Sequence, residues 1–162
     1  MPTETGGPDS PLRIAFSTLA FPDASLASAV SLGREWGYAG VELRLIDGEL
    51  IDPRMPAAAR AQVKRTVTAA GLPVVAVDSS IRLTGEDPGP DLRRFLELAS
   101  DWEAPLVRVF GGALAAGRTE RQEQLAAAAR VLESCVPLAR RLGVAIGVET
   151  HDDFSASSVV AS

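Results

Sequence analysis

Residues 37–45 read GYAGVELRL, a run led by glycine in which apolar and charged residues then alternate. Successive side chains of an extended strand point to opposite faces. The apolar residues of this run therefore share one face, whereas Glu42 and Arg44 share the other. Glycine readily adopts the left-handed conformation that closes helices. The stretch predicts a helix that ends at Gly37, followed by a strand with one charged face.

The same helix-then-strand unit recurs along the chain. The expected strands cover residues 13–19, 41–45, 74–78, 106–110 and 144–149. Apolar residues recur at helical spacing between these strands, and Asp23 is expected to cap the first helix. Gly71 and Gly143 close later helices as Gly37 does. The spacing from Gly37 to Gly71 is 34 residues and that from Gly71 to Gly143 is 72 residues, which indicates one repeated unit.

Strands that alternate with helices in this way form a parallel sheet, and two α/β architectures fit. One is a (β/α) TIM-barrel type fold truncated after its fifth strand, and the other is an open five-stranded doubly wound parallel sheet. The length of 162 residues favours the open sheet, since a complete barrel takes about 250 residues. The charged strand face favours the barrel, because helices on both faces would bury those charges. We expect a partial barrel over residues 12–162, after a flexible leader over residues 1–11.

Composition disfavours several classes of protein. The 16 Lys and Arg against 21 Asp and Glu give a net charge of −5, which does not suit a nucleic-acid or anionic membrane surface. One cysteine, Cys135, and one histidine, His151, are too few for a Cys/His zinc cluster or an internal disulfide. The sequence shows no membrane-length apolar run and no signal-peptide pattern. We expect a cytoplasmic protein with no nucleic-acid or membrane partner.

Three motifs resemble the sugar phosphate isomerase/epimerase family of the xylose isomerase-like TIM barrel superfamily. They are GYAGVELR at residues 37–44, VRVFGG at residues 107–112 and GVAIGVETH at residues 143–151. The resemblance implies a divalent metal ion (Mn, Mg or Zn) and a small sugar, polyol or sugar acid as substrate. Members have eight strands, so it also implies that metal ligands from later strands are absent here. We expect the chain to be inactive by itself.

Glu149 ends the last expected strand and is the first candidate for chemistry. A carboxylate oxygen suits Mg²⁺, Mn²⁺ or Zn²⁺, and the resemblance implies that a carboxylate at this position is both metal ligand and acid/base. The implied reaction removes a proton next to a carbonyl while the metal stabilises the enediolate oxygen. Glu149 is thus the predicted catalytic and metal-binding residue, with a solvated strand-end charge as the alternative.

Five further residues are candidates for substrate binding: His151, Arg108, Glu42, Arg44 and Phe21. If the strand persists, His151 shares a face with Glu149 and its imidazole would bond to substrate; a plain loop histidine is the alternative. Arg108 offers a fork of donors to substrate, or else pairs internally with Asp78 or Glu42. An internal pair is favoured for Glu42 and Arg44, and packing is favoured for Phe21.

Other functions are weighed against this one. Abasic-site endonucleases of the same superfamily use a zinc cluster rich in histidines, which a single histidine does not supply. A non-catalytic flavodoxin-like or receiver-like binding module would explain the length without truncation. An inactive barrel remnant would leave open sheet edges, so a homo-oligomer or a complementing partner chain is expected to cover them.

Overall fold

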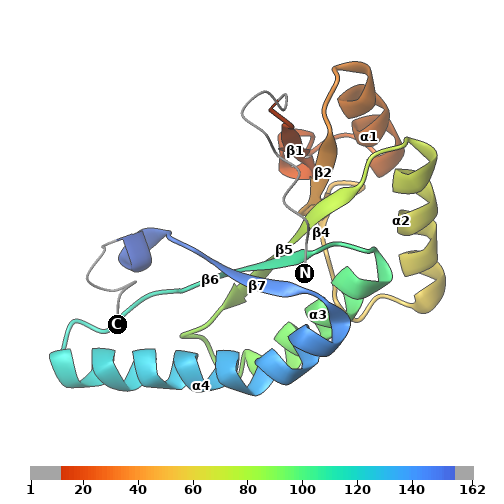
Figure 1. The fold of residues 1–162 in the computed structure, drawn as a ribbon. Helices are drawn as coiled ribbons and strands as arrows, with labels where there is room; N and C mark the ends of the chain where they lie inside the picture. Colours follow the sequence, from red (N-terminus) through yellow and green to blue (C-terminus); the bar gives the residue numbers. More distant parts are fainter. Residues whose placement is uncertain (1–11, 156–162) are drawn as a thin grey trace.

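A five-stranded parallel sheet forms the centre of the structure, a computed structural model that describes residues 12–155 (Figure 1). Its strands lie in the order β1 (Ala15–Ser17), β2 (Gly40–Leu43), β5 (Val74–Arg82), β6 (Leu106–Phe110) and β7 (Ala145–Glu149). Every neighbouring pair in this sheet is parallel, as the alternation of strands and helices predicts. The expected leader over residues 1–11 and the end of the expected domain after residue 155 lie outside the described residues.

Within residues 12–155, four helices alternate with these strands. They are α1 (Leu26–Glu35), α2 (Ala57–Ala69), α3 (Gly89–Asp101) and α4 (Arg118–Leu142). Each helix packs against the next one along the chain, and all four lie on the same side of the sheet (Figure 1). Two short 3-10 helices, η1 (Thr18–Ala20) and η2 (Asp152–Ser155), follow the first and last strands. None of the helices within residues 12–155 is long and apolar enough to cross a membrane.

The strand order separates the two architectures that fit the sequence. The strands of the parallel sheet lie in chain order, without a reversal. Parallel crossovers are almost always right-handed, so crossovers that all run in one direction place every helix on one face. A doubly wound sheet instead contains a point at which the strand order reverses. The open doubly wound alternative is therefore wrong, and the barrel-type arrangement is confirmed.

Apolar strand side chains on the helix side form the core. The fully buried strand residues include Val41, Leu43, Val77, Val107 and Val109. They belong to one core cluster with Leu92, Phe95 and Leu96 of α3, and each such side chain contributes about 1.5–3 kcal/mol of transfer free energy. The predicted glycine closures are confirmed as well, since Gly37 and Gly143 have φ of 82° and 69°. The alternation of residues 41–45 thus does separate a core face from a polar face.

The strand expected over residues 41–45 ends early, at Leu43. Thr18 Oγ1 accepts hydrogen bonds from the backbone N–H groups of Arg44 and Leu45, at 2.9 and 2.8 Å, which diverts the chain from the sheet. The chain then forms a small antiparallel hairpin of β3 (Leu45–Ile46) and β4 (Glu49–Leu50). An Asp-Gly pair with left-handed φ at both residues, 53° and 84°, makes the turn. An Asp-Gly pair strongly predicts a hairpin. We expected a strand over residues 41–45 and did not predict this hairpin.

The cap of α1 also differs from the expectation. Asp23 was expected to cap this helix, but Ser25 is the N-cap residue and its hydroxyl accepts a hydrogen bond from the Ser28 N–H. A second cap comes from a distance, because Asp47 Oδ1 in the hairpin accepts the Leu26 N–H at 2.7 Å. Since the first N–H groups of a helix lack partners within it, the hairpin fixes where α1 begins.

Candidate functional site

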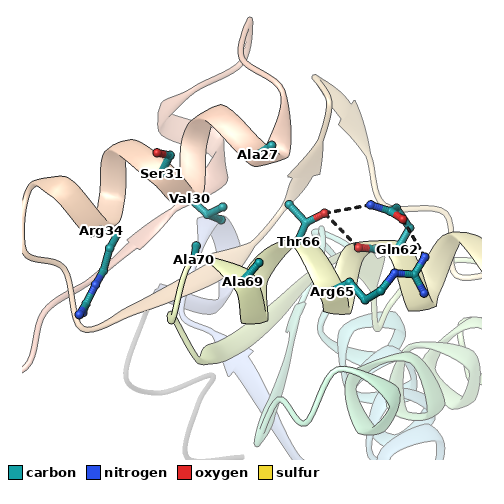
Figure 2. A pocket seen from close by; sticks show the side chains of 9 residues that line it. All are labelled: Ala27, Val30, Ser31, Arg34, Gln62, Arg65, Thr66, Ala69 and Ala70. Carbon is teal, nitrogen blue, oxygen red and sulfur yellow. Dashed lines mark hydrogen bonds between the residues drawn. The ribbon is translucent and has the colours of Figure 1, made fainter.

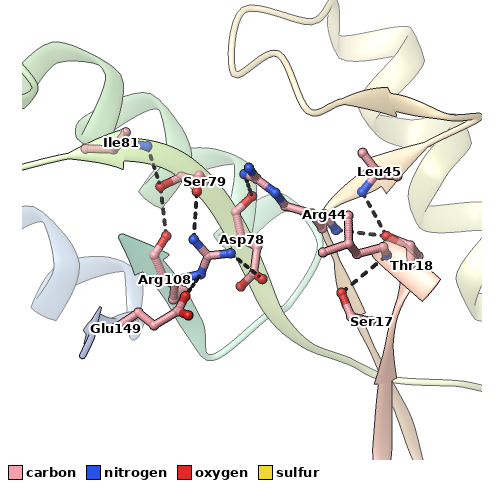
Figure 3. Close-up of polar contacts among 10 residues, drawn as sticks. Ser17, Thr18, Arg44, Leu45, Asp78, Ser79, Ile81, Arg108 and Glu149 are labelled. Carbon is pink, nitrogen blue, oxygen red and sulfur yellow. Dashed lines mark hydrogen bonds and ion pairs between the residues drawn. The ribbon is translucent and has the colours of Figure 1, made fainter. Parts of the chain in front are cut away.

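Charged side chains gather on the sheet face opposite the helices, which we call the polar face. Its charged residues include Arg44, Asp78, Arg108 and Glu149 (Figure 3), and Glu42 joins them through its contact with Asp78. The strand register brings them together, because Asp78 pairs with Arg108 across β5 and β6, and Phe110 pairs with Glu149 across β6 and β7. Four of the six candidates taken from the sequence thus lie on one surface, together with Asp78.

Arg108 is the centre of this face (Figure 3). Its Nη2 lies 2.7 Å from Asp78 Oδ2 and its Nε lies 3.1 Å from Glu149 Oε2. Its Nη1 donates to the backbone oxygen of Ser79 at 3.1 Å, and the Ser79 hydroxyl donates to the backbone oxygen of Arg108 at 2.7 Å. The guanidinium also stacks over the Phe110 ring, 4.0 Å from its centroid. All three guanidinium nitrogens therefore have acceptors within the protein.

The two carboxylates bound to Arg108 differ in exposure. The Asp78 side chain is only 7% exposed and that of Arg108 15%, whereas the Glu149 side chain is 39% exposed. Asp78 is thus the buried anchor of the guanidinium, and Glu149 is the partner that a ligand can reach. The sequence left two interpretations open for Arg108, a substrate contact and an internal ion pair. The structure shows the internal ion pair, with Asp78 as the partner. A substrate contact of Arg108 stays a prediction.

Glu42 and Asp78 form a second contact on the polar face. Burial and then a side-chain hydrogen bond with Asp78 raise the pKa of Glu42, while Ser17 and the Arg108 charge oppose this shift. When both carboxyls are ionised, the buried Asp78 Oδ1 receives no hydrogen bond from the described residues. A buried acceptor without a donor is costly, so this oxygen is the least satisfied polar atom of the site.

Arg44 does not form the ion pair with Glu42 that the sequence favoured. Among the described residues no salt bridge joins the two, and Arg44 Nη1 instead lies 3.5 Å from the backbone oxygen of Asp78. The early end of β2 explains the difference, because the Arg44 backbone is held by Thr18 outside the strand. Burial and then the Arg108 charge lower the pKa of Arg44, although guanidinium groups stay protonated at neutral pH.

His151 lies beyond the last strand and next to its end. β7 stops at Glu149, so the shared strand face expected for these two residues is not formed. The His151 N–H instead donates to the Glu149 backbone oxygen at 3.0 Å. The imidazole packs edge-on against Phe110, with ring centroids 5.4 Å apart. Because Phe110 also lies under Arg108, the turn keeps His151 near the polar face.

Phe21 packs away from the charged residues. Its ring contacts Phe16 edge-on at 5.5 Å and Trp36 at 5.8 Å between centroids. The Phe16 ring lies against Gly33 of α1, so this cluster belongs to the helix side of the sheet. The packing alternative for Phe21 agrees with these contacts, and the structure does not bring Phe21 to the polar face.

Asp78 and Ser79 make more contacts within the site than we predicted from the sequence. Asp78 entered only as a partner for an ion pair, and Ser79 lies beyond the strand expected over residues 74–78. β5 continues to Arg82, because its second half pairs with β6 as far as Phe110. A charged residue directly after the apolar run of residues 74–77 was the available signal for Asp78.

A separate hollow of about 690 Å³ lies between α1 and α2, on the helix side (Figure 2). Small residues such as Ala27 and Ala69 form its walls, and Arg34 and Arg65 lie at its margin. Arg65 is already bonded to Gln62 at 2.7 Å. None of the candidates from the sequence lines this hollow, so the polar face remains the better candidate site.

The donors of the polar face do not by themselves fit a divalent metal ion. No group of three His, Cys, Asp or Glu side chains converges in a metal-binding arrangement within residues 12–155. Glu149 offers one reachable carboxylate, but the guanidinium of Arg108 lies 3.1 Å from it and would repel a cation. The divalent ion expected at Glu149 stays a prediction.

Solved structures of sugar epimerases share this fold. The 3-keto-D-glucoside 4-epimerase YcjR of E. coli matches with a TM-score of 0.65 and 16% identity, over 85% of this chain and 55% of that one. The D-allulose 3-epimerase of Methylomonas sp. matches with a TM-score of 0.67 and 15% identity, over 87% of this chain and 52% of that one. The chain thus spans about half the length of these enzymes, and at such identities the likeness shows the fold alone. None of the curated proteins matches the sequence significantly.

A family model identifies the group to which the chain belongs. The model for the xylose isomerase-like TIM barrel matches residues 30–159, which is most of the sequence. The matched region contains every strand of the parallel sheet except β1, and every candidate site residue except Phe21. This match confirms the resemblance carried by the three sequence motifs. The chain belongs to the xylose isomerase-like TIM barrel family.

Proposed function

We propose that the polar face binds a small sugar, polyol or sugar acid, and that Glu149 transfers a proton in an isomerase or epimerase reaction. The observation that carries the proposal is the half-exposed Glu149 carboxylate, held 3.1 Å from Arg108 at the carboxyl end of a parallel strand. Barrel active sites lie at this end of the sheet. The family and the sugar epimerases that share the fold support the proposal.

The proposed chemistry begins with a carbon-bound proton next to a carbonyl group. Glu149 takes this proton, and the electron pair of the C–H bond moves to form an enediolate. For isomerisation, the carboxylic acid returns the proton to the neighbouring carbon, and the hydroxyl proton of the enediolate passes to the oxygen of the former carbonyl. Epimerisation instead needs delivery of the proton to the opposite face of the same carbon. Arg108 holds the carboxylate in place through its Nε, so the base does not have to be ordered during the reaction.

The substrate class follows from the groups that surround Glu149. Arg44 and His151 lie near the face with side chains able to donate hydrogen bonds, and hydroxyl groups of a polyol can accept such bonds or donate to carboxylates. The divalent ion implied by the family would add Lewis acid chemistry, and it remains part of the proposal. No step described above depends on it.

Binding to the chain can be tested without turnover. We expect D-allulose or 3-keto-D-glucosides, titrated into ¹⁵N-labelled protein, to shift the backbone signals of Glu149, His151 and Gly111. Glu149→Gln should weaken binding several-fold, because one side of the Arg108 contact loses its charge. Glu97→Gln, an exposed change on α3, serves as the matched control. Shifts confined to the α1–α2 side, or no shifts with any sugar of the panel, would contradict the proposal.

Proton transfer needs a separate measurement. Deuterium incorporation from D₂O into the sugar, followed by NMR, reports removal of a carbon-bound proton. The expectation from the sequence is that the 162-residue chain does not catalyse this exchange, since the resemblance implies metal ligands from later strands that are absent here. Exchange that is catalysed by the chain and lost in Glu149→Gln would overturn the expected inactivity while supporting the role of Glu149.

A further inference from the structure

We propose that Glu42 and Asp78 hold one proton between them, and that this acid pair acts as a positioning unit that aims Glu149 through Arg108. The inference deepens the proposed function, because its catalytic meaning rests on Glu149 being the base. Neither Asp78 nor the shared proton follows from the family match. The proton itself can be tested without any ligand.

The geometry of Asp78 requires a donor. Its Oδ2 accepts the Arg108 Nη2 at 2.7 Å, whereas its Oδ1 is buried and has no partner when both carboxyls are ionised. Glu42 lies on the neighbouring strand and its carboxyl is in hydrogen-bonding contact with Asp78. A proton on Glu42 would give Oδ1 the one hydrogen bond that it lacks.

The surroundings of Glu42 leave room for this arrangement. Ser17 Oγ accepts the Leu19 N–H at 3.3 Å, so its own hydrogen is available to one oxygen of Glu42. The other oxygen of Glu42 then carries the proton donated to Asp78. Two adjacent carboxylates that are both charged repel one another, and one shared proton removes this repulsion.

The charges around the pair come from each neighbouring strand. Ser17 belongs to β1, Arg44 follows β2, Asp78 belongs to β5 and Arg108 to β6. Arg108 favours ionised Glu42, but it is already bound by Asp78 and by Glu149 of β7. Burial and the negative charge of Asp78 outweigh this effect in raising the pKa of Glu42.

The shared proton also affects how firmly Arg108 holds Glu149, the proposed base. With Glu42 neutral, Asp78 is the single negative charge on the buried side of Arg108, and the guanidinium is fixed between Asp78, Ser79 and Glu149. Ionisation of Glu42 adds a second negative charge on that buried side and removes the donor to Asp78 Oδ1. Arg108 is then drawn toward β2 and its contact with Glu149 loosens.

The protonation state can be measured by carboxyl ¹³C NMR on the ligand-free chain. We expect the Glu42 carboxyl to titrate above its ordinary value of 4.5, and Asp78→Asn to lower this value because the neighbouring charge is lost. Titration of Glu42 at its ordinary value in the unaltered protein would overturn the proposal, and that measurement needs no variant. It also stands whether or not a sugar binds.

The positioning role has its own readout, the hydrogen exchange of Arg108 Nε–H. In the unaltered protein this exchange, corrected for its intrinsic pH dependence, should become faster as Glu42 ionises. In Glu42→Gln the amide still donates to Asp78 and cannot ionise, so protection should persist, roughly tenfold above the unaltered protein at high pH, the order expected for one hydrogen bond to a charged group. Glu97→Gln should leave the profile unchanged. A profile for Glu42→Gln identical to that of the unaltered protein would overturn the positioning role.

Discussion

Arg108 Nη2 and Asp78 Oδ2 lie 2.7 Å apart, on side chains that are 15% and 7% exposed, and this contact joins the two middle strands of the polar face. Both groups come from strands whose other face is packed against helices. A buried ion pair of this kind contributes little compared with an apolar pair, but removal of one partner is costly because it leaves an uncompensated charge. The contact therefore makes the core and the site depend on each other.

Asp78→Asn should destabilise the fold by about 3 kcal/mol, at the lower end of the range for breaking a buried pair, because Glu149 still contacts Arg108. Urea unfolding followed by circular dichroism measures this change. Arg54→Gln, which breaks the exposed pair of Arg54 with Asp91, should cost about 0.5 kcal/mol or less. Equal effects of the two variants would show that the Asp78 pair is not buried in solution.

Glu42→Gln should change how stability depends on pH. The pKa of Glu42 is raised in the folded protein, mainly by burial and by Asp78, so its favourable contribution is complete below 4.5 and is lost as the pH rises through the raised folded value. Glutamine cannot ionise, so the variant does not lose this stability as the pH rises. We expect a higher Tm than that of the unaltered protein at pH 8 and no such advantage at pH 4. An advantage that is the same at both pH values would contradict the raised pKa.

Gly33→Ala should destabilise α1 packing although alanine favours helices. A Cβ at Gly33 would overlap the Phe16 ring, which is 6% exposed in the core. Overpacking of this kind costs about 1–3 kcal/mol, against about 1 kcal/mol gained in helix propensity. A double-mutant cycle with Phe16→Leu, measured by urea unfolding, should show strong coupling. Additive effects would mean that the ring moves aside freely.

Val148→Lys should reduce association of the chain with itself. Val148 is 39% exposed on β7, which pairs only with β6 among the described strands. It also borders an apolar hollow of about 540 Å³ with Leu132, Val136 and Ile146. Open strand edges beside apolar surface promote association. Sedimentation velocity over a range of concentrations tests this, with Ala127→Lys on α4 as a control of equal charge change; a monomer at every concentration would refute the expectation.

Mn²⁺ should bind weakly to the chain, with a dissociation constant of about a millimolar, which corresponds to roughly 4 kcal/mol. The described site offers one reachable carboxylate with a guanidinium beside it. Electron paramagnetic resonance of free Mn²⁺ measures the bound fraction, and Glu149→Gln should abolish what binding there is. Micromolar affinity would show that further ligands converge on Glu149.

Much of the fold was predictable because it depends on local periodicity. The alternation around Glu42 separates the two strand faces, and the glycines at residues 37, 71 and 143 close helices. β6 lies at residues 106–110 as predicted. Glu149 was identified as a strand-end carboxylate from the same local pattern. The hairpin at Asp47 and Gly48 was equally readable from its turn residues.

The partners within the site depend on strand register, which the sequence does not state. The register of β2 against β5 shifts between Val41 and Glu42, and this shift helps place Glu42 beside Asp78. Arg44 does not pair with Glu42 as expected, because Thr18, which is distant in sequence, binds the Arg44 backbone and ends β2. The sequence by itself therefore determined which residues face away from the core, since that property has the period of the strand. Only the tertiary structure decided which of them meet, because contacts between strands depend on sheet register and on hydrogen bonds between distant segments.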